Sequence, residues 1–440
     1  MTTSADLTEE TLVGYVAAQR WYGSKGREVA HAAVVDCAEL PGAMIALVEV
    51  RFPEGTHDTY QVVAGDRLDG LAEPRVAREL IQRIRSGTSQ LTRDGGTIFF
   101  QVVEGFTGVA AELAAVRVIE SEQTNSSVVF DEELIFKVYR RLEAGINPEL
   151  EMLRFLTERR FEHIAPLLGW YEVEGPLSTT LGVAQELVVD GRDGWELALE
   201  MLRWDAGGLL AHLHSLGAVV ASLHEVLASD ADDPDFGRVD GGVDASAVLA
   251  EAIGDAAAVI LPGLADVPGC EDLADRAPDV ASLAAWLAAD LDAGPLIRHH
   301  GDLHLGQTLW TPDRWVLLDF EGEPIRPVDE RRERRPALRD VAGLLRSLAY
   351  AVATIERTGT PVAPGWEPAA RAALLDGYLA SADPTTIPDA APDVRRLLAL
   401  HELEKVVYEI AYEVAHRPTW VPIPAGALRR TIDQREGAAA

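Results

Sequence analysis

Three polar residues between positions 300 and 320 have the types and spacing that phosphoryl transfer needs. Asp302 is followed five residues later by Gln307, and Asp319 ends the apolar stretch WVLLD. In kinases a catalytic Asp is followed at this interval by an amide that binds metal, and a second Asp lies beyond a strand. One amide oxygen and one carboxylate suit Mg²⁺, which takes its other ligands from water and phosphate. The spacing therefore fits a base and two magnesium ligands.

A zinc site is the alternative for the same stretch. His300 and His304 are four residues apart, like the histidine pair of H-E-x-x-H. That motif must be helical, and Gly301 and Gly306 disfavour a helix here. The stretch also lacks the glutamate at the second position. We expect His300 to support the loop through hydrogen bonds, although it is also a candidate on the substrate side, and His304 to pack beside the loop or face the substrate.

The partner of a nucleotide phosphate should lie further upstream. Lys137 stands among apolar residues in LIFKVYRR, where an ammonium group needs a counter-charge or a ligand. An edge-strand lysine that reaches solvent is the alternative. Glu149 and Glu151, in the next predicted helix, are both candidate partners for Lys137, although acids are in any case favoured in a first helical turn.

Two further segments could contact a nucleotide. Residues 120–127, ESEQTNSS, join two predicted strands where a kinase carries a glycine-rich loop, but glycine is absent and side-chain hydroxyls and amides would have to serve. Residues 184–191, AQELVVDG, occupy the place of a hinge whose backbone could bond adenine. The candidates in these segments are Gln123, Ser126, Glu186 and Val188.

The elements that must position these residues are strands followed by helices. Alternating polarity predicts strands at MIALVEVRF, DTYQVVAG, TIFFQVVEG, AVRVIES, SSVVF, ELIFKVYRR and LGVAQELVVDG. Helices are predicted over residues 8–19, from Asn147 as N-cap with Pro148 in the first turn, and over most of the chain after residue 191. An exposed loop is predicted at 229–245. This order indicates an α+β, two-lobed plan with an extra N-terminal β-rich module.

Composition excludes several classes of protein. With 48% hydrophobic and 25% charged residues, the 440-residue chain has the composition of a folded protein, and no unbroken apolar run reaches membrane-spanning length. A formal net charge of −32 argues against a nucleic-acid or anionic-membrane surface. The acidic start lacks the charge pattern of a signal peptide, and Cys37 and Cys270 form no ligand-spaced pair, so we expect a cytoplasmic protein. The oligomeric state is not indicated.

Several motifs together resemble one family. The stretches QRWYGSKGRE, EQTNSSVVFDEELIFKVYRRLEAGINPELE, HGDLHLGQTLW, LLDFEGEP, LRDVAGLLRSLAYA and YEIAYEVAHRPTWVPIP are similar to those of actinobacterial maltokinases and glucosamine kinases, within the aminoglycoside-phosphotransferase-like kinases. The resemblance runs from residue 19 to about residue 424. It implies a bilobal protein-kinase-like fold with a cap subdomain over 1–95, a strand-rich N-lobe over 96–188 and a helical C-lobe over 189–440.

The same resemblance implies ATP and Mg²⁺ as cosubstrate and cofactor. It makes Asp302 the catalytic base, and Gln307 and Asp319 the Mg²⁺ ligands. Lys137 becomes the phosphate-binding lysine, with Glu151 as its partner and Glu149 as a close alternative. Glu321 and Glu323 stand beyond Asp319, where one of them could contact metal or a neighbouring arginine, or both could be solvated.

The acceptor site is expected on the helix that carries EKVVYEIAYE. Four of its residues recur at i, i+3, i+4 and i+7 and so share a helix face, and two further candidates follow. The acceptor candidates are Lys405, Tyr408, Glu409, Tyr412, Glu413 and Trp420. The alternatives are an ordinary Lys405–Glu409 ion pair and tyrosines in the core. Asp340 and Arg346 are expected to be structural supports.

Two sugars compete as acceptor. The chain lacks the Pro- and Trp-rich lead associated with maltokinases, and Glu409 and Glu413 near Trp420 could hold an ammonium group. We therefore expect phosphorylation of glucosamine to glucosamine 6-phosphate, with maltose to maltose 1-phosphate as the alternative. A catalytically silent nucleotide- or sugar-binding regulator is the alternative from a different class, against which the presence of Asp302, Asp319 and Lys137 argues.

Overall fold

The computed structural model describes residues 7–104, 106, 115–119, 124–324 and 326–439. The chain divides into two compact units, Met1–Asp190 and Gly191–Ala440, which are described separately. The predicted division into three subdomains, with boundaries at 95 and 188, stays a prediction.

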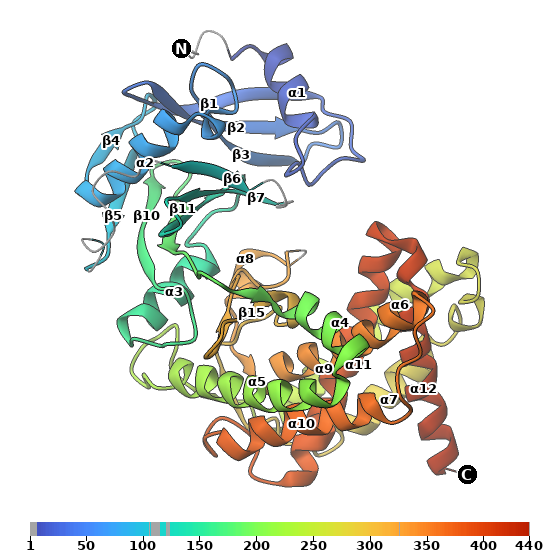
Figure 1. Ribbon diagram of the computed structural model, residues 1–440. Coiled ribbons are helices and arrows are strands. Elements are labelled where there is room, and N and C mark those ends of the chain that lie inside the picture. The colour runs from blue at the N-terminus through green and yellow to red at the C-terminus, as the bar shows by residue number, and fades with distance from the viewer. Residues whose placement is uncertain (1–6, 105, 107–114, 120–123, 325, 440) are drawn as a thin grey trace. The chain divides into compact units, whose positions relative to one another are not determined.

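The first unit begins with an antiparallel sheet covered by one helix (Figure 1). The sheet has the strand order β1-β2-β3-β9. Its strands are β1 (His31–Leu40), β2 (Ala43–Arg51), β3 (His57–Ala64) and β9 (Arg141–Leu142). Helix α1 (Glu9–Ala17) starts at the N-cap Thr8 and buries Leu12 and Val16. Together they enclose a core that includes Trp21 and Tyr60, so the QRWY motif serves the packing of this region.

A seven-stranded antiparallel sheet forms the rest of the first unit, in the order β4-β5-β10-β11-β8-β7-β6. Its strands are β4 (Ser89–Leu91), β5 (Thr97–Val102), β6 (Val116–Ile119), β7 (Asn125–Phe130), β8 (Leu134–Tyr139), β10 (Leu167–Glu174) and β11 (Thr179–Glu186). Helix α2 (Pro74–Ser86) packs on β5, and helix α3 (Pro148–Glu158) contacts β10. As predicted, α3 begins at Asn147, whose side chain accepts a hydrogen bond from Glu149 N at 2.8 Å.

Two buried polar residues tie the two sheets of this unit together. The Gln61 side-chain amide on β3 donates to Tyr139 O at 2.8 Å and to Leu181 O at 2.7 Å. The Arg140 guanidinium, which is 1% exposed, reaches Ser126 Oγ and Gln61 O. Since buried polar groups are costly unless they are bonded, these contacts fix how the small sheet meets the large one.

The second unit is mainly helical. Its helices are α4 (Gly194–Trp204), α5 (Ala206–Leu227), α6 (Gly242–Ile260), α7 (Ala277–Ala288), α8 (Val328–Arg331), α9 (Leu338–Arg357), α10 (Trp366–Ser381), α11 (Ala391–His416) and α12 (Pro422–Ala439). Helix α5 packs along α10, and α11 packs against α9 (Figure 1). Helix α9 is the most enclosed of these in its first three turns, where nearly every residue from Leu338 to Ala349 is buried. This helix therefore provides a rigid floor for the site.

Two small sheets carry the loops of the second unit. One has the order β12-β15-β16 and the other β13-β14-β17. The strands are β12 (Arg192–Asp193), β13 (Val239–Asp240), β14 (Pro295–Ile297), β15 (Thr308–Trp310), β16 (Trp315–Leu317) and β17 (Arg335–Pro336). Strand β14 leads into the stretch that contains Asp302, and the β15–β16 hairpin leads to Asp319.

Most predicted elements are present. The elements that were not predicted include helix α2 and strands β1 and β10, and the loop predicted at 229–245 ends early because β13 and the start of α6 lie within it. A turn joins β15 and β16, and in it Thr311 N donates to Arg314 O at 2.9 Å. The predicted α+β class is confirmed as well.

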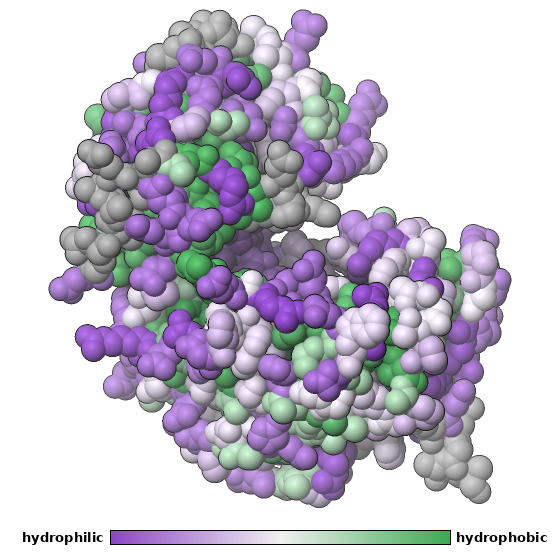
Figure 2. Space-filling view, in the orientation of Figure 1, coloured by the Kyte–Doolittle hydropathy of each residue, from purple (hydrophilic) through white to green (hydrophobic). Residues whose placement is uncertain are grey.

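By length and composition, two helical segments, Ala206–Leu227 and Gly242–Asp266, could cross a membrane. Counting unbroken apolar runs did not single them out. Core helices of folded domains pass the same test, and α5 packs along α10. Figure 2 shows hydrophilic residues over most of the visible face of each unit. The cytoplasmic location stays a prediction.

Candidate active site

The buried Asp340 of α9 holds the loop that carries Asp302. The backbone N–H groups of His300 and Gly301 donate to the two Asp340 carboxylate oxygens, at 2.7 and 2.9 Å. His224 lies 3.1 Å from the same carboxylate. Burial alone would raise the pKa of Asp340, but the hydrogen bond from His224 and the nearby histidines hold it well below its usual range. Asp340 is therefore a structural support, as expected.

The His300 ring faces the protein interior. Its Nε2 donates to Leu318 O at 2.8 Å, and its Nδ1 lies 3.4 Å from Asp302 N, so the ring links the loop to the segment after β16. The residue is 2% exposed. The expectation that His300 supports the loop is thus met, and its place among substrate-side candidates is corrected. The segment 300–304 is not helical, so the geometry of H-E-x-x-H is absent from it.

Gln307 and Asp319 are brought together by the β15–β16 hairpin. The Gln307 amide Nε2 donates to Asp319 Oδ2 at 2.9 Å, and Leu318 N donates to Gln307 O at 2.9 Å. Asp319 follows β16 by two residues and has a φ of 61°, an uncommon left-handed conformation for a residue other than glycine. Such strained positions often occur at functional sites. One amide and one carboxylate in contact form a donor set that fits Mg²⁺.

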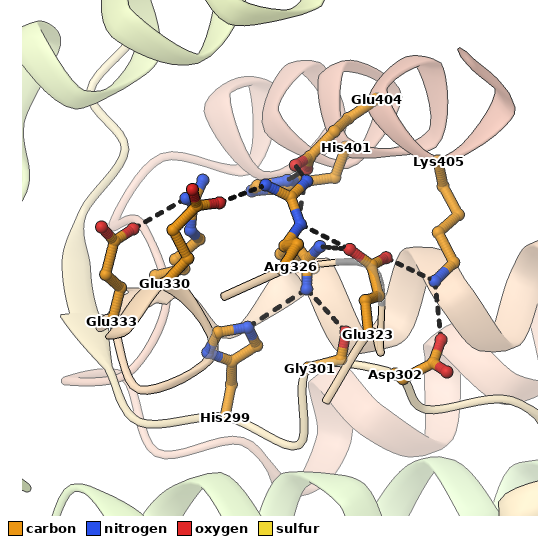
Figure 3. A network of polar contacts seen from close by, with 12 residues as sticks. His299, Gly301, Asp302, Glu323, Arg326, Glu330, Glu333, His401, Glu404 and Lys405 are labelled. Carbon is orange, nitrogen blue, oxygen red and sulfur yellow. Dashed lines mark hydrogen bonds and ion pairs between the residues drawn. The ribbon is translucent and has the colours of Figure 1, made fainter. Parts of the chain in front are cut away.

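The Asp302 carboxylate is held by an ammonium group from another element. Lys405 Nζ on α11 donates to Asp302 Oδ1 at 2.9 Å and to Glu323 Oε1 at 2.8 Å (Figure 3). Burial would lower the pKa of Lys405, but the two carboxylates raise it above its ordinary value. Lys405 therefore stays protonated beside Asp302.

Glu323 stands at the centre of a buried ion network (Figure 3). Its Oε2 accepts from Arg326 Nε at 2.6 Å and from Arg339 Nη2 at 2.8 Å. Burial would raise the pKa of Glu323, but Lys405, Arg339 and Arg326 lower it to about 2. Of the alternatives for Glu323, the contact with neighbouring arginines is the one observed.

A cavity of about 540 Å³ opens beside Asp302 within the second unit. All six acceptor candidates line it, together with Asp302 and His304. They are Lys405, Tyr408, Glu409, Tyr412, Glu413 and Trp420. The helix face predicted from their spacing is therefore real, and the cavity is of the size that small-molecule ligands occupy.

The two glutamates of α11 that face the cavity are paired with arginines. Arg346 Nη2 donates to Glu409 Oε2 at 2.7 Å, so Arg346 supports this wall as expected. Arg417 Nη2 donates to Glu413 Oε1 at 2.6 Å. Glu409 thus pairs with Arg346. An ordinary Lys405–Glu409 ion pair, which was the alternative, is not among the contacts that the structure shows for Lys405.

Sequence reasoning missed one wall of the cavity. The start of α4 contributes Asp193, Trp195 and Glu196, and α9 contributes Tyr350. Tyr350 stacks on Trp420 with ring centroids 6.3 Å apart and an interplanar angle of 13°. Asp193 is the N-cap of α4, since its Oδ1 accepts from Glu196 N at 2.9 Å. The sequence RDGWE carries this capping signal, but nothing in it indicates the cavity.

In the first unit, the Lys137 ammonium lies 2.9 Å from Glu149 Oε2. The Tyr139 hydroxyl donates to the same oxygen at 2.7 Å. Lys137 and Tyr139 are alternate residues of β8 and so point to the same face, where both reach Glu149. Glu149, the alternative, is therefore a partner of Lys137, and the assignment of Glu151 stays a prediction. Glu151 is buried in the same helical turn.

The other nucleotide candidates have mixed outcomes. Ser126 Oγ accepts a hydrogen bond from Arg140 Nε at 2.8 Å. The backbone N–H of Glu186 donates to Pro166 O at 3.0 Å, so an adenine contact at this residue would fall to its carbonyl group and stays a prediction. Val188 lies in the irregular segment just after β11. Gln123 lies outside the described residues.

Two models of known protein families match separate stretches of the chain. The model of the phosphotransferase enzyme family matches residues 115–322, and that of the maltokinase N-terminal cap domain matches residues 15–95. A glucosamine kinase of Streptacidiphilus jiangxiensis is 31% identical over 76% of this chain and 77% of its own length. A glucosamine kinase of Mycolicibacterium smegmatis is 30% identical over 72% of this chain and 80% of its own.

The fold agrees with these matches. A solved glucosamine kinase, in complex with glucosamine, ADP and inorganic phosphate, superposes with a TM-score of 0.70 and 25% identity. The match covers 92% of this chain and 95% of that one. The predicted family resemblance is thereby confirmed. The chain belongs to the glucosamine kinase family of phosphotransferases and is a sugar kinase, a nucleotide-using enzyme with an alcohol group as acceptor.

Proposed function

We propose that this kinase transfers the γ-phosphoryl group of ATP to the 6-hydroxyl of glucosamine. The lining of the cavity beside Asp302 supports this proposal, because it contains five carboxylates but only two cationic side chains. The cations Lys405 and Arg417 are themselves paired with Asp302 and Glu413. A wall with excess negative charge favours a cationic acceptor over a neutral sugar.

Two of the carboxylates are available for an ammonium group. Within the part of the chain that the structure describes, neither Asp193 nor Glu196 carries an ion pair. Both lie at the start of α4 and line the cavity. Tyr408, Tyr412 and Trp420 add aromatic surface that suits the apolar face of a pyranose ring. These features support an aminosugar, because maltose, a neutral disaccharide, would leave the excess negative charge of the cavity without a counter-charge.

Asp302 is assigned as the base. Its carboxylate would accept the proton of the acceptor hydroxyl while the bond from that oxygen to phosphorus forms and the bond to the leaving ADP oxygen breaks. The Lys405 contact holds one Asp302 oxygen, which leaves the other to face the acceptor. Lys137 is assigned to the phosphates, and Gln307 and Asp319 to Mg²⁺, which would neutralise phosphate charge when bound.

A coupled ATP assay with glucosamine, N-acetylglucosamine, glucose and maltose tests this assignment. We expect the highest kcat/KM with glucosamine and a marked loss with N-acetylglucosamine, which has lost the cationic amine. Asp302→Asn should lower kcat by about 10²- to 10⁴-fold while ATP still binds. Activity with maltose alone would overturn the substrate, and full turnover by Asp302→Asn would overturn the base.

A further inference from the structure

Glu323 has no role in the proposed chemistry, yet its buried carboxylate is linked by hydrogen bonds to the region around Asp302. It lies beyond the Asp319 turn, and its carboxylate is 1% exposed. It receives three cationic donors, one each from Lys405, Arg326 and Arg339. A buried carboxylate is stable only when it is fully paired, so this network fixes the position of every donor in it.

The network reaches Asp302 along two routes. The first is direct, because the same Lys405 ammonium that Glu323 holds also donates to Asp302 Oδ1 at 2.9 Å. The second runs through Arg339, whose Nη1 donates to the carbonyl of Gly301, the residue before Asp302, at 2.7 Å. Glu323 is thus joined to both the side chain and the backbone of the loop (Figure 3).

We propose that Glu323 is a positioning residue, which anchors the Lys405 ammonium and through it sets the orientation of the Asp302 carboxylate. Without this anchor, Lys405 could follow Asp302 into any of its rotamers, and the carboxylate would not face one direction. With the anchor, one Asp302 oxygen is fixed and the other is directed to the acceptor. The inference rests on the proposed role of Asp302 as the base.

The contact of one ammonium group with two carboxylates explains why a lysine suits position 405. The three donors of the ammonium lie on one compact group and can serve two carboxylates at once, whereas the guanidinium of arginine is a larger, planar fork with fixed donor directions. Lys405→Arg keeps the charge but should not reproduce the bridge between Asp302 and Glu323. We therefore expect Lys405→Arg to resemble the loss of Glu323 in kcat.

Kinetics test the effect on the reaction. Glu323→Gln should lower kcat by about 10- to 100-fold with an unchanged KM for ATP, because the misdirected base affects only the transfer step. The effect of Glu323→Gln should become much smaller in a Lys405→Met background, since the route through that ammonium is then lost and only the route through Arg339 remains. Glu330→Gln is the matched control, because Glu330 contacts Arg326 at 3.3 Å on the outer edge of the same network and is 44% exposed.

Chemical labelling tests the anchor without any turnover. The chain has only three lysines, Lys25, Lys137 and Lys405, so acetylation by acetic anhydride can be followed at each by mass spectrometry. Glu323→Gln should raise the acetylation rate of Lys405 about tenfold relative to the exposed Lys25, because the ammonium loses a stabilising carboxylate. Glu330→Gln should leave this ratio unchanged.

The two readouts separate the possible failures. If wild-type protein does not phosphorylate glucosamine, the proposed substrate is wrong, while labelling still decides whether Glu323 anchors Lys405. An unchanged Lys405 acetylation ratio, or a kcat of Glu323→Gln within about twofold of wild type, overturns the positioning role. If Glu323→Gln does not fold, Glu323→Asp, which keeps the charge but shortens the side chain, should show the same changes in smaller measure.

Discussion

At the scale of single residues, the Glu149 carboxylate receives two donors from one strand, the Lys137 ammonium and the Tyr139 hydroxyl. If Lys137 holds nucleotide phosphates, Glu149→Gln should release its ammonium and raise the KM for ATP by about 10-fold, the effect of about 1.4 kcal/mol of lost binding. The KM for the sugar should change little, because the acceptor cavity lies in the other unit. Steady-state kinetics with each substrate varied in turn would measure both constants.

Glu151→Gln provides the matched control for this experiment. It removes the same charge from the same helical turn, two residues further on, and we expect it to change the KM for ATP less than Glu149→Gln does. A larger effect from Glu151→Gln would restore the partner that the family resemblance implied. Equal effects would mean that charge in this turn matters rather than one ion pair.

The pair at Glu149 illustrates which site residues a sequence can predict. Asp302, Gln307 and Asp319 could be proposed from the sequence because a loop and a hairpin preserve their order and spacing. The choice between Glu149 and Glu151 depends instead on where two side chains of β8 point relative to the start of α3. That geometry arises from packing between elements distant in sequence, and spacing along the chain does not contain it.

At the scale of elements, the loop with Asp302 depends on α9. Two loop N–H groups donate to Asp340. Gly343, one turn further, lies so close that a Cβ there would be 2.4 Å from Leu303 O. The loop thus rests directly on the helix backbone. A side chain at position 343 would push the loop towards the cavity.

Asp340→Asn should therefore destabilise the second unit, by about 3 kcal/mol, as expected when one partner of a buried charged network is lost. The pKa of Asp340 is depressed in the folded protein, so its contribution is present above its unfolded pKa of about 4 and is lost as pH falls. Wild-type stability should thus fall below pH 4 more steeply than that of Asp340→Asn.

Urea unfolding at several pH values, followed by tryptophan fluorescence, measures both effects. The exposed Asp255 on α6 gives a matched Asp→Asn control that should change neither stability nor its pH dependence appreciably. Parallel pH curves for wild type and Asp340→Asn would show that the Asp340 carboxylate does not have the depressed pKa assigned to it.

Two of the strands that sequence reasoning missed share a physical cause. Strand β1 has a register shift between Val34 and Asp36, and β10 has shifts after Leu167 and after Tyr171. A bulge adds a residue to one strand and so breaks the alternation of buried and exposed positions. Strands and helices with regular periodicity, such as β8 and α11, were predicted because their partners leave the period intact.

At the scale of the whole molecule, acidic residues far outnumber basic ones. The chain has 71 acidic and 39 basic residues, and its formal net charge is −32. Many basic side chains form local ion pairs, as at Glu323, Glu409 and Glu413. The acidic residues in excess therefore repel one another without equal compensation.

Added salt should therefore stabilise the protein. The Debye length falls from about 30 Å at 0.01 M to about 8 Å at 0.15 M, so repulsion among distant surface carboxylates is screened. Buried pairs such as Glu323–Arg339 are screened much less, because their charges lie out of water. If about 1 kcal/mol of repulsion is relieved, the Tm of each unfolding transition should rise by about 2–4 °C.

Scanning calorimetry in NaCl and in tetramethylammonium chloride separates screening, which both salts supply, from binding of a specific cation. A fall in Tm with NaCl would show that exposed ion pairs, rather than net repulsion, dominate the surface electrostatics.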